Sequence, residues 1–555
     1  MTLTRRGFLL GSLALTGGVL VSPSAQSRSF FGYKENPVRD HSPPGWLIRG
    51  TVCTMNDKRE IFNRGAVRTA GATIASVSDS GPDENAGGAS VIETGGILYP
   101  GLIDLHKHIT YDIRGPWFPR QRFRKRTEFF FDPDYRRTVE NPCRLLVHYA
   151  DLLNEVCLYS EVKVLAGGTT AFQGAAIHDP IYTSQLVRNV EFENFGRDRV
   201  HQTIWDVTAE SAPALRRLLP RLDAWVYHLS EGVDDYAQQR FADLKQFGLL
   251  TEKLVAIHGI GLTPAELGEL AQAGATLVWG PLGNLRLYGQ TTDIRAAHRA
   301  GLRLCLGSEW APSGSKNLLT DLKVADQYNR RVLDGLLSDR ELVEMVTANP
   351  AAAVGWKGKA GQLTSGAAAD MVLVKKKAAD PYRNLIEATE EDIEMVFIDG
   401  EPVYGDAELM RSVKPRGTEL LQPRRGRAKA LVFDAPAGGR CGSFGELRQT
   451  LQSMLLLEEA VLARRLNRLK VRRALTPNPP PVQQEYPFFL GIGDEPLEAE
   501  EIARFVETVF PEGAVPFSLD PVFVADDSEF ARVIQDPALV ERGIELKPYF
   551  ESLLP

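Results

Sequence analysis

The chain has 555 residues, of which 64 are Lys or Arg and 71 are Asp or Glu, so its formal net charge is −7. With 43% hydrophobic and 24% charged residues, the composition is that of a globular protein and excludes a disordered or collagen-like chain. The slight acidic excess gives no support to a nucleic-acid-binding function, because a basic excess is typical of such proteins. Five cysteines without CxxC spacing exclude a structural zinc ribbon and argue against a disulfide scaffold.

Residues 1–25 predict an export signal. Arg5 and Arg6 precede an apolar run from Leu9 to Val21, which is too short to cross a hydrocarbon core of ~30 Å as a helix. Small residues at 22–25 suit cleavage. The paired arginines resemble a twin-arginine signal, and a short N-terminal helix or an uncleaved anchor is the alternative. We therefore expect an exported protein, periplasmic or extracellular, with no stable membrane insertion after the signal is cleaved.

Two stretches of short β-type segments flank the middle of the chain. After a linker at residues 26–45, residues 46–97 alternate apolar runs such as WLIRGTVCTM with Gly and Asn turns, which predicts a small antiparallel sheet. The pattern returns in residues 358–415, for example in EMVFIDGEPVYGD. We expect the two stretches to form one small composite β-sandwich.

Residues 98–357 alternate short apolar strands, such as AWVYHL and LVAIHG, with amphipathic helices such as TPAELGELAQAG. This alternation is typical of parallel βα units with both faces of the sheet covered. The length, about 260 residues, is also usual for an eight-stranded βα barrel. The predicted fold class is therefore α/β, with a (β/α)8 TIM-type barrel inserted in the composite β-sandwich.

Residues 416–555 contain no chemical motif and predict an additional, mainly helical C-terminal region. Apolar residues at mixed i+3 and i+4 spacing predict a long amphipathic helix over Leu447–Lys470, and a second helix is expected over Leu497–Phe510. No histidine follows His298 in the sequence, so this region cannot donate one to a site. We expect it to serve packing or oligomerisation, which makes a homo-oligomer one expected assembly.

The strongest chemical signal is the segment PGLIDLHKH at residues 100–108. Side chains alternate across a strand, so His106 and His108 point to the same side. At the C-terminal end of a barrel strand, both imidazoles would enter the top of the barrel, where such enzymes keep their active sites. Two neutral imidazoles on one face are a natural start for a zinc or iron(II) site. An isolated HxH also arises by chance, but the apolar strand and PG turn before it favour the metal site.

Three further strand ends carry side chains of the same kind. His228 closes AWVYHL and completes three nitrogen donors, with Glu231 just beyond it as a mobile acid or base. His258 ends the apolar strand LVAIH, and Glu309 follows the strand LCLGS. A structural histidine at any one of these positions would be unremarkable, but histidine or carboxylate at four separate barrel-strand ends is harder to explain as packing.

Together these segments resemble the amidohydrolase superfamily. The resemblance covers roughly residues 46–405, in the order PGLIDLHKH, GGTTAF, HLSE, AIHG, GPLGNL, LGSEW and TANPAAAVG…GQLTSGAAADMVLV. The branch that these motifs look most like is the mononuclear one, with triazine chlorohydrolases and cytosine, guanine and adenosine-type deaminases. It implies a metal-dependent hydrolase of non-peptide carbon–nitrogen bonds, such as a cyclic amidine deaminase or an amide or imide hydrolase, with a small-molecule substrate and no nucleic-acid partner.

The resemblance also implies a role for each residue at the strand ends. One divalent metal ion, zinc or alternatively iron(II), would be bound by four ligands, namely His106, His108, His228 and Glu309. Glu231 would be the proton shuttle, His258 would hold the nucleophilic water, and Glu309 would also act as the base. These three form the expected catalytic set.

The chain departs from the family pattern at several positions. The family's last position is usually aspartate, and Glu309 is longer by one methylene. The usual His-Cys-Pro-x-Ser-Asn reads WGPLGN at residues 279–284, which alters the substrate contacts. Asn284 and Ser313 are the expected substrate-binding residues, although Ser313 fits a turn equally well. Lys163 lies in the strand-two region, where a carboxylated lysine bridging two metals is an alternative.

The substrate and the activity itself remain open at this level. The long loop at residues 111–137 is rich in Arg and Phe, and it predicts either a cationic, aromatic lid for an acidic or planar substrate or a solvated run of charges. A catalytically degenerate, exported binding protein is the alternative function. A working hydrolase whose C-terminal region docks a partner is a third interpretation.

Overall fold

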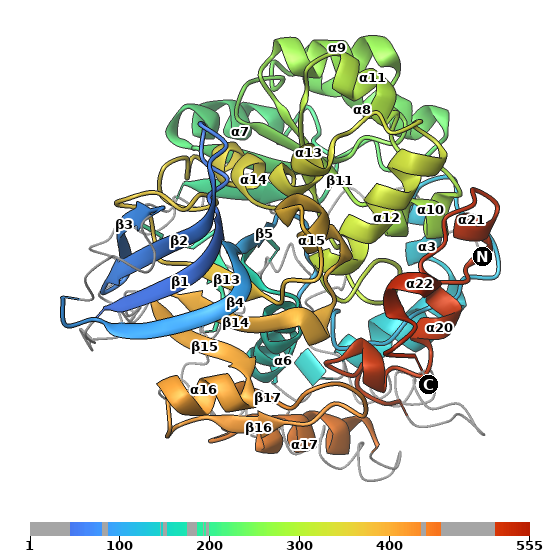
Figure 1. Cartoon of the computed structure of the whole chain (residues 1–555). Coiled ribbons are helices and arrows are strands. Elements are labelled where there is room, and N and C mark those ends of the chain that lie inside the picture. The colour runs from blue at the N-terminus through green and yellow to red at the C-terminus, as the bar shows by residue number, and fades with distance from the viewer. Residues whose placement is uncertain are drawn as a thin grey trace, which may run out of the picture.

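The computed structural model describes residues 45–79, 87–144, 146–147, 152–174, 186–192, 194–195, 199–433, 440–456 and 517–554. The predicted export signal at 1–25, nearly all of the linker at 26–45 and the predicted helix at 497–510 lie outside these residues. In the part of the chain that is described, no helix is both long and apolar enough to cross a membrane. The fold is mixed α/β (Figure 1).

Strands from both ends of the described chain share one nine-stranded sheet (Figure 1). Its strands are β1 (Trp46–Cys53), β2 (Ile61–Ala70), β3 (Thr73–Ser78), β4 (Ser90–Pro100), β13 (Met371–Val374), β14 (Ile393–Ile398), β15 (Glu401–Asp406), β16 (Glu419–Leu421) and β17 (Lys429–Leu431). The two stretches meet where β4 pairs antiparallel with β13, with Leu98 opposite Leu373. The sequence predicted that the two stretches join, and the structure brings them together in one sheet, whereas their arrangement as a sandwich stays a prediction.

The sheet differs from the prediction in two respects. It is not wholly antiparallel, because β1 and β4 run parallel. The antiparallel strands β2 and β3 lie between β1 and β4 in the chain. The sheet also continues past residue 415, since β17 pairs with β15 and β16 pairs with β17.

Eight short parallel strands form two further sheets, one of three strands and one of five. The first contains β5 (Leu102–Asp104), β6 (Thr169–Phe172) and β7 (Arg188–Asn189), and the second contains β8 (Val200–Thr203), β9 (Ala224–Leu229), β10 (Leu254–His258), β11 (Thr276–Trp279) and β12 (Arg303–Leu306). Every residue of β5, β6, β9, β10 and β11 is buried, which is why these strands read as continuous apolar runs. A parallel bridge between Lys107 and Glu309 joins the chain just after β5 to the chain just after β12.

Helices follow most of these strands (Figure 1). They include α6 (Leu153–Ala166), α7 (Ala212–Leu218), α8 (Asp235–Gln246), α9 (Pro264–Gln272), α10 (Pro281–Tyr288), α11 (Ile294–Arg299), α12 (Leu318–Arg331), α13 (Asp339–Glu344) and α14 (Ala348–Ala353). The predicted helix TPAELGELAQAG is confirmed as α9. It begins with a capping box between Thr263 and Glu266 and buries Leu267 and Leu270.

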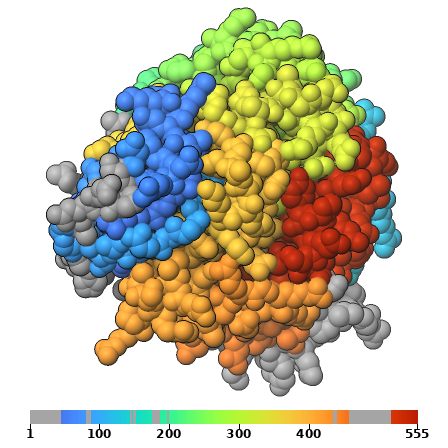
Figure 2. Space-filling view, viewed as in Figure 1, coloured from blue at the N-terminus to red at the C-terminus, as the bar shows by residue number. Residues whose placement is uncertain are grey.

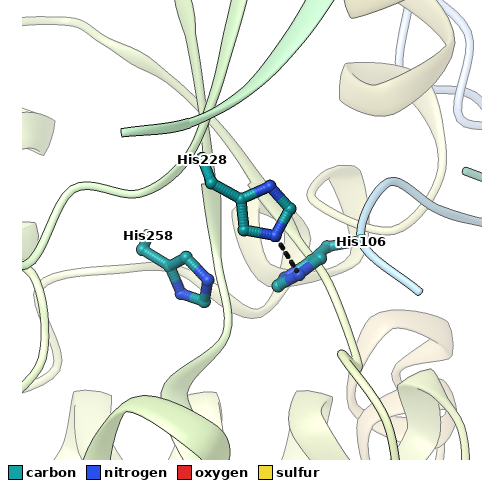
Figure 3. A group of neighbouring side chains, drawn as sticks. All are labelled: His106, His228 and His258. Atoms are coloured by element: carbon teal, nitrogen blue, oxygen red, sulfur yellow. Dashed lines mark hydrogen bonds between the residues drawn. The ribbon is translucent and has the colours of Figure 1, made fainter. Parts of the chain in front are cut away.

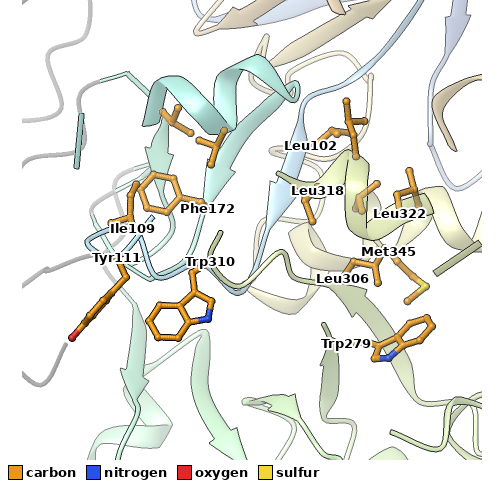
Figure 4. Packing of buried hydrophobic residues seen from close by; sticks show 14 of the residues in the cluster. Leu102, Ile109, Tyr111, Phe172, Trp279, Leu306, Trp310, Leu318, Leu322 and Met345 are labelled. Carbon is orange, nitrogen blue, oxygen red and sulfur yellow. The ribbon is translucent and has the colours of Figure 1, made fainter. Parts of the chain in front are cut away.

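Apolar side chains from distant segments pack between these strands and helices (Figure 4). Leu102 of β5, Leu306 of β12 and Leu318 of α12 belong to one buried cluster, and each is fully buried. Trp310 and Tyr111 lie in the same cluster beside the ends of the strands, with ring centroids 5.1 Å apart. The core therefore continues up to the loops that follow β5 and β12.

Lys163 lies in a helix and not in a strand. It belongs to α6, all of whose residues are buried. Its ammonium group lies 2.6 Å from Asp520 and 3.3 Å from Asp112. Lys163 therefore lies before the second parallel strand, β6, which begins only at Thr169, and it does not stand at a strand end. An ammonium group committed to two carboxylates also gives no support to a carboxylated lysine that bridges two metals.

The described parts of the C-terminal region pack onto the rest of the chain (Figure 2). Helix α17 (Phe444–Leu455) confirms the start of the predicted amphipathic helix, and Phe444 stacks on Tyr159 of α6 at 5.6 Å. Residues 517–554, red in Figure 2, contain the short helices α20 (Phe530–Val533), α21 (Pro537–Val540) and α22 (Lys547–Phe550). Their apolar side chains form a cluster with Leu282, Leu285 and Val324.

Candidate active site

Backbone hydrogen bonds between the ends of β5 and β12 fix the first two histidines. The amide of Glu309 donates to the carbonyl of His106 at 2.7 Å, and the amide of His108 donates to the carbonyl of Glu309 at 2.9 Å. The Asp104 carboxylate accepts from the amides of His106 at 3.1 Å and Ser308 at 3.2 Å. The two strand ends that carry predicted site residues are thus held side by side.

Four buried histidines converge at these strand ends. The Nε2 atom of His106 lies 3.1 Å from Nε2 of His108. It also lies 3.2 Å from Nε2 of His228 (Figure 3). The ring of His258 stands perpendicular to that of His106, with centroids 4.8 Å apart. Among the described residues, His106, His228 and His258 form a group whose candidate ligand atoms all lie within 4.8 Å of one another. His106 and His108, which follow β5, thus lie on one side, as predicted.

The histidine nitrogens have the spacing and charge state that a metal ion requires. Zn–N bonds of 2.0–2.1 Å at tetrahedral angles separate neighbouring ligand nitrogens by about 3.3 Å, close to the distances observed here. Burial, followed by the neighbouring histidines, holds the pKa of His106 well below its ordinary value. Burial also lowers the pKa of His108 to about 3 and that of His228 well below its ordinary value. The imidazoles are therefore neutral donors at neutral pH, which is the form that binds metals.

Three residues at the strand ends have left-handed backbone conformations. Ser230, His258 and Glu309 have φ angles of 51°, 71° and 58°. Such angles are uncommon for residues other than glycine and cost free energy, so they persist only where the surrounding structure holds them. They follow β9, end β10 and follow β12, and each turns the chain sharply where a predicted site residue stands.

His258 is oriented by Asn284 of α10. Its Nδ1 donates to Oδ1 of Asn284 at 2.9 Å, and the Asn284 amide nitrogen donates to Thr291 at 3.2 Å. The second bond fixes the orientation of the amide, so its oxygen faces the imidazole and Nε2 keeps its lone pair. Asn284 is fully buried. Its observed contacts are with His258 and Thr291, and its predicted substrate contact remains a prediction.

Glu231 lies between His258 and a tyrosine. Its Oε1 accepts a hydrogen bond from the Tyr288 hydroxyl at 2.7 Å, and its Oε2 lies 3.5 Å from Nε2 of His258. Arg126 lies on the same carboxylate, with Nη1 3.5 Å from Oε2. Glu231 and His228 also line a pocket with residues from three other segments, Lys125, Arg126, Thr127, Asp206, Tyr236, Ala237 and Arg240.

The Glu309 carboxylate points toward the start of α10. Its Oε1 lies 3.6 Å from Nδ1 of His258, and its side chain fills the space beside Gly280 and Gly283. Burial first, and the Glu231 carboxylate next, raise the pKa of Glu309 well above its ordinary value. A raised pKa makes an ionised carboxylate a stronger base. The predicted role of Glu309 as a metal ligand stays a prediction.

The loop at residues 111–137 packs buried aromatic side chains over this region, while Arg120, Arg122 and Arg124 are exposed. Trp117, Phe123 and Phe129 are buried within it, and Trp310 lies 6.5 Å from Phe129 and 5.4 Å from His108 between ring centroids. Several of its basic residues pair with carboxylates or carbonyls, as Arg126 does with Asp206 and Glu231. Lys125 and Arg126 nevertheless line the pocket beside His228, so the interpretation as a lid is the better one.

Several residues with contacts at the site were not predicted from the sequence. Tyr288 and Arg126 contact Glu231, and Lys107 occupies the position between the two histidines of β5. The sequence indicates a role for Lys107 and Asp104, because charged residues within the apolar run PGLIDLHKH need buried partners. No sequence pattern indicates the contact of Tyr288, because its partner is distant in sequence. Ser313 is fully buried and its hydroxyl accepts from the Trp310 indole, which is the turn-shaping alternative.

Comparison with known proteins gives a consistent picture. Residues 223–403 match the model of the amidohydrolase family. The chain is 25% identical over 411 residues to a 5-methylthioadenosine/S-adenosylhomocysteine deaminase of Pyrococcus furiosus, which covers 66% of this chain and 95% of that relative. A deaminase of the same name from Syntrophobacter fumaroxidans is 25% identical over 417 residues, and the match covers 66% of this chain and 93% of that relative.

Solved structures share the fold at lower identity. A zinc-bound adenosine deaminase of Xanthomonas campestris has a TM-score of 0.54 at 20% identity, covering 65% of this chain and 93% of that one. A zinc complex of an atrazine chlorohydrolase from Arthrobacter aurescens has a TM-score of 0.52 at 20% identity, covering 64% and 95%. The guanine deaminase of E. coli has a TM-score of 0.51 at 17% identity, covering 65% and 99%.

Proposed function

The chain belongs to the amidohydrolase superfamily, and on that basis we propose that it is a metal-dependent deaminase acting on an amino-substituted heterocycle. The coarser activity, hydrolysis of carbon–nitrogen bonds other than peptide bonds, is that of the superfamily members it matches. The observation that carries the proposal is the convergence of His106, His108 and His228 from two strand ends, with their Nε2 atoms 3.1 and 3.2 Å apart.

One divalent cation fits the donor set, and we propose zinc, with iron(II) as the alternative. His106, His108 and His228 would hold it, and Glu309 would complete the set if its carboxylate turns from Gly283 toward the histidines. The buried Nδ1 of His106 has no hydrogen-bond partner, so nothing in the described structure competes for this ring through its second nitrogen. When bound, the cation supplies Lewis acidity that gives water the strength of a nucleophile near neutral pH.

The protein's own groups would then carry the protons. Glu309 would accept a proton from the attacking water, because its carboxylate lies in the site, 3.6 Å from Nδ1 of His258. His258, fixed by Asn284, would orient the water through Nε2. Glu231 would deliver a proton to the departing nitrogen, so that ammonia leaves and the ring keeps an oxygen. Tyr288 donates to Glu231 and holds it within reach of His258.

The substrate we propose is a small planar heterocycle bearing an exocyclic amino group. Two observations favour deamination over amide or imide hydrolysis. The relatives that match over two thirds of the chain are deaminases, and the pocket beside His228 and Glu231 lies under a loop with buried aromatic side chains. The alternative of a catalytically degenerate binding protein finds no support, because His106, His108, His228, His258, Glu231 and Glu309 lie together in one buried site.

The test is ammonia release from a panel of aminopurines, aminopyrimidines and aminotriazines, with amides and cyclic imides as the competing class. Protein stripped by a chelator should be inactive and should regain activity with one equivalent of zinc. His228→Asn should lose activity by more than about 100-fold. His298→Asn is the matched control, because His298 pairs with Glu341 away from the site. Hydrolysis of amides alone would replace deamination by the second candidate, and metal-independent activity would contradict the proposal.

The wider organisation of the chain is proposed on the sequence pattern. We propose that the two parallel sheets together form the eight-stranded barrel, with the boundaries at residues 98–357 and the flanking β-region at 46–97 and 358–415. The twin-arginine-like signal supports export to the periplasm or beyond. The protein is expected to act on a small molecule without a nucleic-acid partner, and a homo-oligomer is one expected assembly.

A further inference from the structure

A buried series of alternating charges connects the histidine strand to the C-terminal segment. The Lys107 ammonium lies 3.1 Å from the Asp112 carboxylate, which lies 3.3 Å from Lys163. Lys163 lies 2.6 Å from Asp520, and Asp520 also pairs with Lys316. Lys316 then lies 2.8 Å from the last member of the series, which is Asp527.

The charges in this series balance, and all of them are buried. It holds three ammonium groups and three carboxylates, on Lys107, Lys163, Lys316, Asp112, Asp520 and Asp527, and each of these side chains is at most 4% exposed. A buried ion pair that loses one partner leaves an uncompensated charge, which is far more costly than the pair was favourable. Asp520, like Asp112, pairs with two lysines, and its loss would leave one excess positive charge.

The first member of the series lies between two residues of the candidate metal site in the sequence. Lys107 lies between His106 and His108, and its ammonium donates to the carbonyls of Ser315 at 3.1 Å and Lys316 at 3.0 Å. Asp112 accepts from the amide of Ala311 at 2.8 Å, two residues after Glu309. The series therefore ties the loop after β5 to the loop after β12, which are the loops that carry three of the predicted ligands.

Backbone contacts hold Asp520 in this place. Its amide donates to the carbonyl of Ile113 at 2.9 Å, and its own carbonyl accepts from the Tyr159 hydroxyl at 2.7 Å. The carboxylate is thus fixed between the loop after His108 and helix α6. Asp520 lies outside residues 223–403, the part of the chain that matches the family model.

We infer that Asp520 is a positioning residue for the metal centre, through which the C-terminal segment at residues 517–554 completes the site from behind. By neutralising Lys163 and Lys316, it leaves Asp112 committed to Lys107 and to the amide of Ala311. An excess positive charge in this series would repel a dication and release the two loops. This inference rests on the proposed function, because it assumes that the histidines bind a metal ion.

The test measures zinc affinity of the full-length protein by competition with a chromophoric chelator, and the visible spectrum of the cobalt(II) form. Asp520→Asn should bind zinc about 10- to 100-fold more weakly, which is the usual effect of losing an outer partner of a metal site. Lys163→Met/Asp520→Asn restores the charge balance, with Lys107 paired to Asp112 and Lys316 to Asp527, and should recover the affinity to within a few-fold. Glu541→Gln is the matched control, because Glu541 pairs with Arg122 at the surface of the same segment.

The outcomes separate this inference from the function on which it rests. If the wild-type protein binds no zinc, that result would contradict both the inference and the proposed function. Wild-type affinity in Asp520→Asn would overturn the inference and leave the proposed function standing. If Asp520→Asn does not fold, the balanced double variant decides, since recovery of fold and zinc binding supports the inference. A balanced variant that folds but binds zinc as weakly as the single variant overturns it, because packing and not charge would then be responsible.

Discussion

The carboxylate of Glu309 lies where a side chain on Gly283 would stand. A Cβ atom on Gly283 would be 1.9 Å from Oε2 of Glu309, and one on Gly280 would be 2.7 Å from Oε1. Both distances are below van der Waals contact, so the longer carboxylate uses space that two glycines at the start of α10, the N-cap Gly280 and Gly283, leave open. In the sequence, Glu309 and the glycines of WGPLGN are separate departures from the family pattern. In the structure, the glycines leave the space that the Glu309 carboxylate occupies.

This contact predicts that substitutions at the two positions compensate each other. Gly283→Ala should lower kcat/KM by about 100-fold, because the methyl group displaces Glu309 from its productive position. Glu309→Asp/Gly283→Ala should be at least about 10-fold more active than Gly283→Ala alone, since the shorter carboxylate clears the methyl group. The measurement is steady-state kinetics of the wild type, Gly283→Ala, Glu309→Asp and the double variant.

Gly268 provides the control for this cycle. It lies in helix α9, and a Cβ atom there would meet no atom within 4 Å. Gly268→Ala should therefore leave activity unchanged and raise stability slightly, because glycine is a poor helix former. Equal losses in Gly283→Ala and in the double variant would show that the two side chains do not interact.

The hydrogen bond from His258 to Asn284 predicts a loss of turnover without a loss of substrate binding. Asn284→Ala leaves Nδ1 of a buried imidazole without its acceptor, so the ring orientation and tautomer are no longer fixed. We expect kcat to fall by about 10- to 100-fold with KM changed by less than about 3-fold. Asn63→Ala, at an exposed position of β2, is the control. A change in KM alone would instead support the predicted role of Asn284 in substrate binding.

A comparison of two tyrosines beside the same pocket, Tyr288 and Tyr236, distinguishes a role in proton transfer from a role in packing. The Tyr288 hydroxyl donates to Glu231 at 2.7 Å, whereas the Tyr236 hydroxyl donates to Asp206. Tyr288→Phe should lower kcat by roughly 10-fold, because a charge-assisted hydrogen bond to the proposed proton shuttle is lost. Tyr236→Phe should stay within about 3-fold of the wild-type rate. Similar effects in both variants would mean that the pocket responds to polarity in general.

A buried lysine predicts how stability changes with pH. Burial lowers the pKa of Lys323 from its ordinary 10.5 to about 7, and its ammonium group reaches the carbonyls of Leu319 and Ala388. Between pH 7 and 10.5 the unfolded chain keeps a proton that the folded protein has released, so the free energy of unfolding rises with pH. The full pKa shift would raise the free energy of unfolding by up to about 5 kcal/mol between pH 7 and 10.5.

The measurement is denaturant unfolding at intervals from pH 7 to pH 10. The difference in unfolding free energy between wild type and Lys323→Met should move in favour of the wild type as the pH rises. Lys375→Met, at an exposed position, is the matched control. A constant difference for Lys323→Met would show that this lysine keeps its proton in the folded protein.

The sequence by itself determined which residues reach the site, because the relevant patterns are local. Alternation along a strand places His106 and His108 on one side, and the structure brings their Nε2 atoms within 3.1 Å. An apolar strand that ends in His258, or that is followed by Glu309, predicts a side chain at the strand end, and the two lie 3.6 Å apart. Their roles as ligands and catalysts remain predictions from the family resemblance.

Tertiary structure alone decided which side chains meet them. Three contacts join segments that no local pattern relates: Asn284 with His258, Gly283 with Glu309, and Asp520 with Lys163. Tyr159 likewise contacts Asp520, which lies 361 positions away in the sequence. Periodicity and spacing fix the direction of a side chain relative to its own strand or helix. Contact partners depend on how separate elements pack, since burial requires each charge and polar group to find a partner wherever the folded chain supplies one.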